Sequence, residues 1–374
     1  MITIALLAGA RPNFIKAAPL WRAFNRAAEM QVRLIHTGQQ RDAAMSTAIL
    51  REMGLPDPDV VLSGNGQTIL QESARIALAL EPVLLEWKPD WVVAIGDVTS
   101  TLAGTVAAKQ MGLRVAHVEA GLRSGDRQMP EELNRIAVDH LADALFASEP
   151  AAVDNLHREG LPAGRVFFSG NVLIDALADK HRQINAWSRE EIFHPLLGTG
   201  LEATLDRDFA LITVHRPSNV DTPEGLRRIA GLLRVAARHL PVVFPVHPRT
   251  WNNMQQFGLN QMLVEGSGVL VLPPLGYGQM VGLLQRARLV ITDSGGVQEE
   301  TTWLGKPCLT FRTHTERPAT TQIGTNTLIA DLNPETADHY IRLILAGQYK
   351  TGGIPPLWDG QAAGRIVDQL AALQ

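Results

Sequence analysis

The chain has 374 residues, more than a single hydrophobic core usually holds, so two domains are expected. Its composition, 45% hydrophobic and 19% charged, is typical of a globular protein, and a net charge of -4 without a long basic run argues against nucleic acid as a partner. A single cysteine, Cys308, excludes an internal disulfide and a metal site built from several thiolates.

The N-terminal apolar run, Ile2–Leu7, is more typical of a first buried strand than of a signal peptide. No basic residue precedes it, and Arg11-Pro12 follows shortly afterwards. No apolar run in the sequence approaches the roughly 20 residues that cross a bilayer. We therefore expect a cytoplasmic protein with no membrane partner.

Residues 1–170 are predicted to form a first lobe. Short runs of apolar, often β-branched residues are typical of strands that are buried on both faces of a sheet. Such runs occur at Ile2–Leu7, Val32–His36, Trp91–Ile95, Val115–Val118, Ala144–Ala147 and Val166–Phe168. Helix-length segments separate them, including Gln67–Lys88, Thr101–Met111 and Glu131–Leu141. This alternation predicts βαβ units on a parallel sheet.

Residues 171–359 are predicted to form a second lobe of the same kind. The stretch Val172–Phe193 has a helical pattern without a strand, and new strand-like runs begin beyond it. They are Phe209–Val214, Val242–Val246, Val269–Leu272, Leu289–Thr292 and Cys308–Phe311. The amphipathic stretch Gly360–Leu373 predicts a last helix, within residues 360–374, that packs back on the first lobe. The fold class is therefore α/β with two Rossmann-like lobes, and Cys308 is expected to be a buried strand thiol.

Reactive side chains follow several of the predicted strands. In parallel α/β sheets, ligands bind beyond the carboxyl ends of the strands. The residues found there are Asp97, Glu119, His215, His247 and Asp293. Each of them taken singly is best interpreted as a helix cap or a loop carboxylate. Because they come from both lobes, together they predict a polar cleft between the lobes that holds the active site.

The turn after the first strand is suited to binding an anion. The segment Gly9–Lys16 has Arg11 where the dinucleotide fingerprint GxGxxG has its second glycine, so no nicotinamide cofactor is expected. The N–H groups that begin the next helix still face an anion, and Arg11 and Lys16 add positive charge. The alternative is that both are solvated surface charges. We favour the ligand role for Arg11 and weigh the two interpretations equally for Lys16.

The strongest local signal in the second lobe is Ser294-Gly295-Gly296, followed by Glu300. Two glycines after a strand let the backbone approach a pyrophosphate, and the helix N-terminus supplies hydrogen-bond donors. Glu300, one turn into that helix, is placed to accept both hydroxyls of a ribose. The alternative is a glycine turn with a capping box, in which Ser294 and Glu300 are structural.

A further carboxylate candidate lies where Glu131 and Glu132 open a helix just after Pro130. Acidic residues there complement the helix dipole, which is the structural interpretation. The functional interpretation is that the preceding loop carries one of these carboxylates into the cleft.

Short motifs spread over nearly the whole chain resemble, in order and spacing, those of the non-hydrolysing UDP-N-acetylglucosamine 2-epimerases. They are Gly9–Lys16, His36–Gln39, Gly96–Thr101, His117–Arg123, Pro130–Arg135, Gly170-Asn171, Thr213–Arg216, Pro245–Pro248, Thr292–Glu300, Thr315–Pro318 and Asp359–Gln361. The resemblance implies a GT-B-like fold, a homodimer, and inversion at C2 of a UDP-linked 2-acetamido sugar without a metal or cofactor. UDP would leave from C1 while a base removes the C2 proton, and would then add back to the resulting 2-acetamidoglucal.

The resemblance also assigns roles to individual residues. It implies that the catalytic residues are Asp97, Glu119, Glu131 and His215. It implies that the nucleotide contacts are Arg11, Lys16, Ser294, Gly295, Gly296, Glu300 and Arg317.

The sequence departs from this family pattern in two places. Gln39-Gln40 stands where many bacterial members have Gln-His, and the loop between Asp126 and Pro130 is short. Those members use this neighbourhood to bind a second, activating UDP-N-acetylglucosamine, so weak or absent activation is expected here. The short loop, the Gly-Ala-Arg-Pro opening and Pro248-Arg249-Thr250 are similar to relatives that act on UDP-2,3-diacetamido uronic acids.

Several functions therefore stay open. The preferred one converts UDP-N-acetylglucosamine to UDP-N-acetylmannosamine. The alternatives are a C2 epimerase of a UDP-2,3-diacetamido uronic acid, a hydrolysing epimerase, a GT-B glycosyltransferase and a non-catalytic sugar-nucleotide sensor. The retained set of Asp97, Glu119, Glu131 and His215 argues against the sensor.

Overall fold

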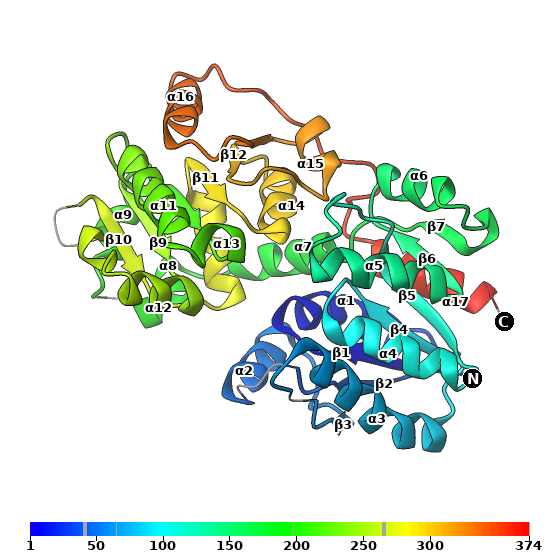
Figure 1. The fold of residues 1–374 in the computed structure, drawn as a ribbon. Helices are drawn as coiled ribbons and strands as arrows, with labels where there is room; N and C mark the ends of the chain where they lie inside the picture. Colours follow the sequence, from blue (N-terminus) through cyan, green and yellow to red (C-terminus); the bar gives the residue numbers. More distant parts are fainter. Residues whose placement is uncertain (40–42, 65, 197, 264–266, 374) are drawn as a thin grey trace. The chain divides into compact units, whose positions relative to one another are not determined.

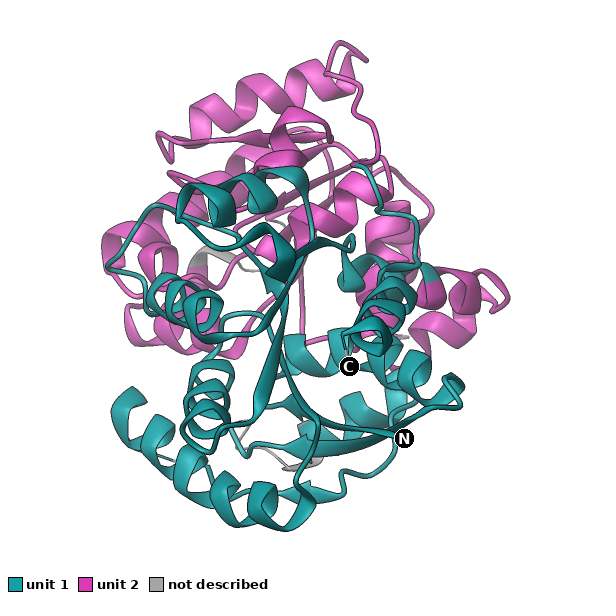
Figure 2. Cartoon of the chain, turned by 90° about the vertical axis from the view of Figure 1, so that its right-hand side faces the viewer, with its two compact units in different colours: residues 1–178, 356–374 teal, residues 179–355 magenta. Residues whose placement is uncertain are grey.

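The computed structural model describes residues 1–39, 43–64, 66–196, 198–263 and 267–373. The chain divides into two compact units, which we call unit 1 (residues 1–178 and 356–374) and unit 2 (residues 179–355) (Figure 2). Each unit is a parallel sheet with helices packed on it (Figure 1). The predicted α/β class, with two parallel-sheet lobes, is confirmed.

Unit 1 contains a seven-stranded sheet in the described part of the chain, with the order β3-β2-β1-β4-β5-β6-β7. The strands are β1 (Ile2–Ala8), β2 (Met30–His36), β3 (Val60–Val61), β4 (Trp91–Ile95), β5 (Arg114–Ala120), β6 (Ala144–Ala147) and β7 (Val166–Phe168). Its central strands are apolar on both faces, because helices cover both, and every residue of β4 is buried.

The helices of unit 1 form two groups, in which α3, α4 and α5 pack in series and α1 contacts both α2 and α17. Their bounds are α1 (Arg11–Arg26), α2 (Ala43–Met53), α3 (Ile69–Trp87), α4 (Thr99–Gln110), α5 (Pro130–Leu141), α6 (Pro150–Arg158), η1 (Ala163–Arg165), α7 (Val172–Asn185) and α17 (Ala362–Ala372). Proline stands in the first turn of α1, α5 and α6, where its missing N–H costs no helical hydrogen bond.

The C-terminal segment is fastened to unit 1 by buried polar groups. The Asp175 carboxylate accepts hydrogen bonds from the N–H groups of Ala362 (3.1 Å) and Ala363 (2.7 Å) at the start of α17. Trp358 is buried and donates from Nε1 to the carbonyl of Ser148 at 2.9 Å. These contacts, together with the packing of α17 on α1, explain why residues 356–374 belong to unit 1.

Unit 2 contains a six-stranded sheet in its described residues, with the order β10-β9-β8-β11-β12-β13. The strands are β8 (Ala210–Thr213), β9 (Val242–Pro245), β10 (Val269–Leu272), β11 (Leu289–Thr292), β12 (Cys308–Thr310) and β13 (Asn326–Leu328). The helices are α8 (Arg189–Phe193), η2 (His194–Leu196), α9 (Leu201–Leu205), α10 (Pro217–Val220), α11 (Pro223–Ala237), α12 (Pro248–Gln256), η3 (Asn260–Leu263), α13 (Tyr277–Arg286), α14 (Gly295–Trp303), α15 (Pro318–Gln322) and α16 (Pro334–Leu345).

The predicted strands are all present, with small shifts at their ends, but the sequence reading missed β3 and β13. Both are edge strands of two or three residues, too short to carry a strand pattern. The helix-like stretch Val172–Phe193 is interrupted, because α7 ends at Asn185 and α8 starts at a capping box formed by Ser188 and Glu191. Burial raises the pKa of Cys308 on β12 to about 11, and the predicted buried strand thiol is confirmed.

The division between the units falls inside α7, between residues 178 and 179, whereas the sequence placed a boundary after residue 170. A continuous helix crosses this point, so no turn or composition change marks it.

Candidate active site

The strand order of unit 1 reverses between β1 and β4, because β2 lies beyond β1 on one side and β5 lies beyond β4 on the other. Open α/β sheets bind their ligands at such a switch point, beyond the carboxyl ends of the strands. Asn13, in the first turn of α1, donates from Nδ2 to the carbonyl of Ile95 at the end of β4 (2.8 Å). The start of α1, with Arg11 as its first residue, is thereby held at the switch point.

The turn between β1 and α1 requires glycine. A side chain at Gly9 would collide with the hydroxyl groups of Thr37 and Ser100. This close packing brings the backbone of the turn against the loop after β2 and the first turn of α4. The glycine that opens the anion-binding turn therefore has a packing role as well.

Lys16 and Glu119 form a buried ion pair at the unit 1 switch point. Lys16 is 8% exposed and Glu119 is 6% exposed. Glu119 has a φ of 74°, an unfavourable left-handed conformation for a non-glycine residue, and the register of β5 against β6 shifts at this point. A Cβ atom at Gly96 would lie 3.9 Å from both Lys16 Nζ and Glu119 Oε2, so the pair adjoins the Gly96-Asp97 turn.

Asp97 is held by the first half of α5. Its Oδ2 accepts hydrogen bonds from Arg135 Nη2 (2.6 Å) and Nε (3.2 Å), and its backbone carbonyl accepts one from Asn134 Nδ2 (2.8 Å). Arg135 is itself paired with the buried Glu132, which also accepts from the backbone N–H groups of Ser124 and Gly125 at 2.9 to 3.0 Å. The Asp97 side chain remains 27% exposed, so its carboxylate is fixed and still accessible.

Glu131 lies in the first turn of α5, next to this network, and is half-buried. Within the described residues its carboxylate takes part in no hydrogen bond or ion pair, unlike those of Asp97 and Glu119. The structure therefore groups Lys16, Asp97 and Glu119 closely, whereas Glu131 is connected to them only through α5.

The strand order of unit 2 reverses between β8 and β11, and Asp293 joins the ends of these two strands. Asp293 is fully buried and accepts hydrogen bonds from the backbone N–H groups of His215 (3.0 Å) and Arg216 (2.9 Å). It also accepts from Asn219 Nδ2 at 3.0 Å. His215, which follows β8, and Ser294, which follows β11, are thereby brought to one switch point.

His215 is surrounded by positive charge. Its Nδ1 lies 3.5 Å from Asp293 Oδ1, and its ring packs against that of His247 with centroids 5.3 Å apart. Desolvation lowers the pKa of His215 below its usual value, and the guanidinium groups of Arg216, Arg312 and Arg249 lower it further, while Asp293 opposes them. The imidazole therefore favours its neutral form in this setting.

Three arginines surround Glu316 beside this histidine. Glu316 pairs with Arg312 Nη2 (2.8 Å), with Arg216 Nη2 (3.3 Å) and with Arg317. Burial alone would raise the pKa of Glu316, but the three guanidinium groups hold it well below the usual range. Arg317 Nε also lies 3.0 Å from Oε1 of the buried Glu299, so two carboxylates face three guanidinium groups and the cluster keeps a surplus of positive charge next to the start of α14.

Gly295 and Arg317 lie against each other at the start of α14. A side chain at Gly295 would collide with the Arg317 guanidinium and with Glu316, so glycine is required there. Ser294 occupies the cap position of α14, but its side chain makes no capping hydrogen bond in the described chain, so the predicted capping-box alternative is not formed. Gly296 lies in the first turn of α14, and the buried Glu300 lies in its second turn. Free N–H groups beside a surplus of positive charge suit a pyrophosphate.

The model of the family described as UDP-N-acetylglucosamine 2-epimerase matches residues 22–371. The chain belongs to the UDP-N-acetylglucosamine 2-epimerase family. It is 35% identical to the UDP-N-acetylglucosamine 2-epimerase of Methanocaldococcus jannaschii, over 97% of each chain. It is 37% identical to the UDP-2,3-diacetamido-2,3-dideoxy-D-glucuronate 2-epimerase of Pseudomonas aeruginosa, over 99% of each.

Solved structures of epimerase-family members are similar along the whole chain. The M. jannaschii enzyme in complex with UDP-GlcNAc and UDP has a TM-score of 0.89 and 34% identity, covering 99% of this chain and 100% of that one. The Neisseria meningitidis enzyme bound to UDP-GlcNAc has a TM-score of 0.89 and 28% identity, covering 100% of both chains. The chain therefore has the two-lobed fold of this family, which is a family of isomerases.

Several residues of this epimerase-family site received no role from the sequence. They are His117, Arg135 and Asp139 in unit 1, and Asn219, Arg312 and Glu316 in unit 2. The detectable signal was a polar residue inside an apolar strand, as for His117. The arginine cluster gave no such signal, because its members meet only in the folded unit.

No metal site and no membrane span are found in the described residues of this epimerase-family chain. No three histidine, cysteine or acidic side chains are grouped so that they could hold a metal ion. None of the described helices combines the length and the apolar character needed to span a bilayer.

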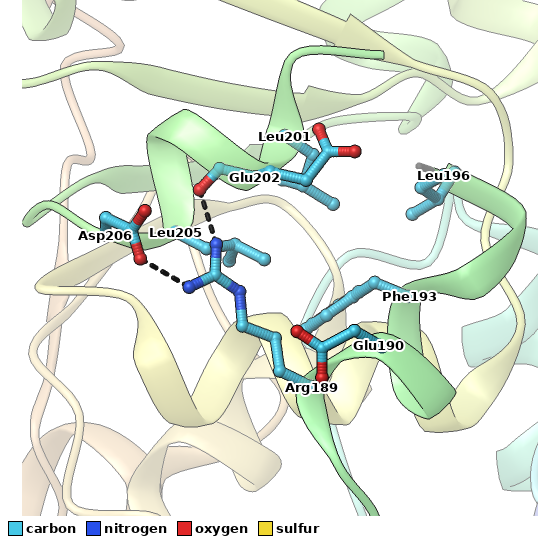
Figure 3. A pocket seen from close by; sticks show the side chains of 8 residues that line it. All are labelled: Arg189, Glu190, Phe193, Leu196, Leu201, Glu202, Leu205 and Asp206. Atoms are coloured by element: carbon cyan, nitrogen blue, oxygen red, sulfur yellow. Dashed lines mark hydrogen bonds and ion pairs between the residues drawn. The ribbon is translucent and has the colours of Figure 1, made fainter. Parts of the chain in front are cut away.

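A cavity of about 250 Å³ lies in unit 2 between α8 and α9 and contains none of the predicted site residues (Figure 3). Arg189 extends across it and donates to the backbone carbonyl of Glu202 and to the carboxylate of Asp206. Phe193, with its neighbouring leucines, forms the apolar wall. The cavity's polar groups are thus used in joining the two helices, and we assign it to packing.

Proposed function

We propose that the chain inverts C2 of UDP-N-acetylglucosamine to give UDP-N-acetylmannosamine. The observation that carries this proposal is that a member of this family has one switch point rich in fixed carboxylates, in unit 1, and another rich in positive charge, in unit 2. Unit 1 would supply the acid–base groups and unit 2 the nucleotide-binding groups for the same UDP-sugar. No nicotinamide or metal enters the reaction.

The reaction proceeds by elimination and re-addition. A carboxylate removes the C2 proton while the C1–O bond breaks, and the bonding electrons leave with UDP. The product of this half-reaction is a 2-acetamidoglucal. UDP then adds back to C1, and a proton returns to the opposite face of C2. Asp97, Glu119 and Glu131 are the candidates for the proton transfers, and the fixed positions of Asp97 and Glu119 support them.

Unit 2 would stabilise the departing diphosphate. The start of α14 at Ser294-Gly295-Gly296 offers backbone N–H groups, and Arg317 lies directly against it. His215 lies at the same switch point and would donate a hydrogen bond to the phosphate. We also propose that Arg11 and Lys16 reach the nucleotide from unit 1 and that Glu300 binds its ribose.

A second substrate deserves equal testing. The 37% identity to the P. aeruginosa enzyme favours a UDP-2,3-diacetamido uronic acid as the alternative sugar. Incubation of the purified protein with a panel of UDP-sugars, one at a time, decides the matter. Epimer without free UDP supports the proposal and names the sugar. Stoichiometric UDP release would instead indicate a hydrolysing epimerase, and no reaction with any sugar would indicate a transferase or a sensor.

Activation by a second UDP-N-acetylglucosamine is expected to be weak or absent. The loop before Pro130 is short, and Gln39 is engaged with the backbone N–H of Ser100 at 3.3 Å. Gln40, the other departure, lies outside the described residues. Initial rates should then depend hyperbolically on substrate concentration, and clear sigmoidality would contradict this expectation.

We propose that the protein is a homodimer that acts in the cytoplasm. Helix α3 exposes Leu70 (79%), Leu78 (69%) and Leu85 (58%), which share one face of the helix. Such an apolar ridge is typical of a surface that a second copy covers. Light scattering tests the dimer by measuring the molar mass of the wild type and of Leu78→Glu. The wild type should have the mass of a dimer and the variant that of a monomer. A monomeric wild type would contradict the proposed dimer.

A further inference from the structure

A completely buried histidine–aspartate pair lies beneath the unit 1 switch point. His117 is on β5 and Asp139 is on α5, and neither is exposed to solvent. His117 Nδ1 lies 2.6 Å from Asp139 Oδ1, and His117 Nε2 lies 2.8 Å from the backbone carbonyl of Gly96. Neither residue is among the groups that the proposed reaction uses.

The hydrogen bonds of His117 determine its protonation. A backbone carbonyl can only accept, so Nε2 must carry a hydrogen. Asp139 Oδ2 accepts from the backbone N–H of Gly121 (3.0 Å) and pairs with Arg123 Nη1 (2.7 Å), as expected of an ionised carboxylate. An ionised carboxylate also only accepts, so Nδ1 carries a hydrogen too. Both ring nitrogens are therefore donors, and the ring is an imidazolium.

The surroundings of Asp139 favour its ionised form. Burial alone would raise the pKa of Asp139, but the positive charges of His117 and Arg123 hold it below the usual value. Arg123 is shared with Glu159, whose Oε2 lies 2.7 Å from Arg123 Nη2 and 4.0 Å from His140 Nδ1. The buried imidazolium thus has a carboxylate at hydrogen-bond distance, and the neighbouring guanidinium has a second one.

The pair also brackets the proposed catalytic carboxylates. Asp139 binds His117, two residues before Glu119, and the backbone N–H of Gly121, two residues after it. It therefore clamps both sides of the register shift at which Glu119 adopts its left-handed conformation. On its other side, His117 holds the carbonyl of Gly96, the residue before Asp97.

We propose that His117 is a positioning residue that, as an imidazolium bound to Asp139, fixes the carboxylates of Glu119 and Asp97. Its effect on turnover rests on the proposed function. Its protonation does not, because that follows from the hydrogen bonds alone. The two parts are therefore tested by different measurements.

The protonation is tested by nitrogen NMR of the wild-type protein labelled with ¹⁵N-histidine. The signal of His117 is assigned by its loss in His117→Gln. At neutral pH both ring nitrogens should carry a hydrogen, because the groups they contact are both acceptors. In Asp139→Asn the counter-ion is lost, so one of the two hydrogens should disappear. A wild-type His117 in a neutral tautomer at that pH would overturn the proposal.

The positioning role is tested by steady-state kinetics of His117→Gln and Asp139→Asn. Misplacing a reacting group by about 1 Å can cost about 100-fold in rate, so kcat should fall by about that factor. UDP affinity and KM should change by less than about twofold, because the proposed UDP ligands are untouched; a merely structural role would not separate kcat from KM. Asp139→Asn keeps the shape of the side chain, so this variant still tests the positioning role if His117→Gln does not fold.

A matched control is available in unit 2. His239 lies just after α11, and its Nε2 is 2.7 Å from Oδ1 of Asp338 in α16, a contact of similar length that touches no proposed site residue. His239→Gln should leave kcat at the wild-type value. Wild-type kcat in folded His117→Gln and Asp139→Asn would overturn the positioning role. By contrast, a wild type inactive on every UDP-sugar would count against the proposed function.

Discussion

At the scale of single residues, the proposed acid–base groups differ in what holds them. Glu119 is buried and forms an ion pair with Lys16. Asp97 forms an ion pair with Arg135 and remains partly exposed. Fixing a carboxylate before substrate arrives avoids the cost of ordering it during the reaction. The two carboxylates therefore lend themselves to separate tests.

Replacing Glu119 with Gln, or Asp97 with Asn, should lower kcat by about 100-fold or more, the usual contribution of a general acid or base. UDP affinity should stay near the wild-type value.

Epimerisation by the wild type in heavy water should place deuterium at C2 of the product. Unlabelled product would contradict elimination and re-addition.

Glu119→Gln also leaves Lys16 buried without a counter-ion, which should cost up to about 3 kcal/mol of unfolding free energy. The double variant Lys16→Met/Glu119→Gln should recover stability but not activity. Chemical denaturation and steady-state kinetics separate the two effects. Full activity in stably folded amide variants would show that Asp97 and Glu119 have a structural role and no catalytic one.

The surroundings of His215 predict that UDP binding takes up a proton. Desolvation and the guanidinium groups lower the pKa of the free protein's His215, so near pH 6.5, the ordinary histidine value, it is mostly neutral. A bound diphosphate adds negative charge and raises that pKa, so a proton enters at pH values between the free and bound pKa.

Titration calorimetry in two buffers of different ionisation enthalpy measures this uptake. The heat should depend on the buffer in the wild type and much less in His215→Asn. The comparison removes the contribution of UDP's own phosphate, which both proteins share. Equal buffer dependence in the two proteins would contradict the prediction.

At the scale of elements, the sequence was informative wherever a strand is buried on both faces. The predicted strands Trp91–Ile95 and Leu289–Thr292 match β4 and β11 residue for residue. A continuous apolar run of four or five residues is typical of a strand that is buried on both faces. The reactive residues after these strands were found for the same reason. The partners Arg135 and Arg312 were not, because what they bind depends on tertiary contacts that no local pattern encodes.

The start of α14 gives a prediction at this scale. Gly295→Ala places a methyl group against Arg317, so either the arginine or the helix start must move. UDP affinity should weaken by about tenfold or more, which corresponds to about 1.4 kcal/mol. The matched control is Gly364→Ala in α17, where nothing lies within 4 Å of the added methyl group. Unchanged UDP affinity in Gly295→Ala would show that Arg317 and α14 do not bind the nucleotide.

At the scale of the whole molecule, the two units are separate compact bodies joined through α7 and the segment before residue 356. The proposed ligands of one UDP-sugar come from both units, with Arg11 in unit 1 and the α14 start in unit 2. A ligand that contacts both units stabilises only those arrangements in which both reach it. Binding should therefore change the dimensions of the protein.

Small-angle scattering should show a smaller radius of gyration when UDP is saturating. The control is Arg11→Ala, which removes a unit 1 ligand but leaves the unit 2 groups intact. This variant should bind UDP more weakly. At saturation its radius of gyration should decrease less than that of the wild type, because fewer contacts with UDP then stabilise the compact arrangement. Equal dimensions of the wild type with and without UDP would mean that the nucleotide contacts one unit alone, and Arg11 would then lose its proposed role.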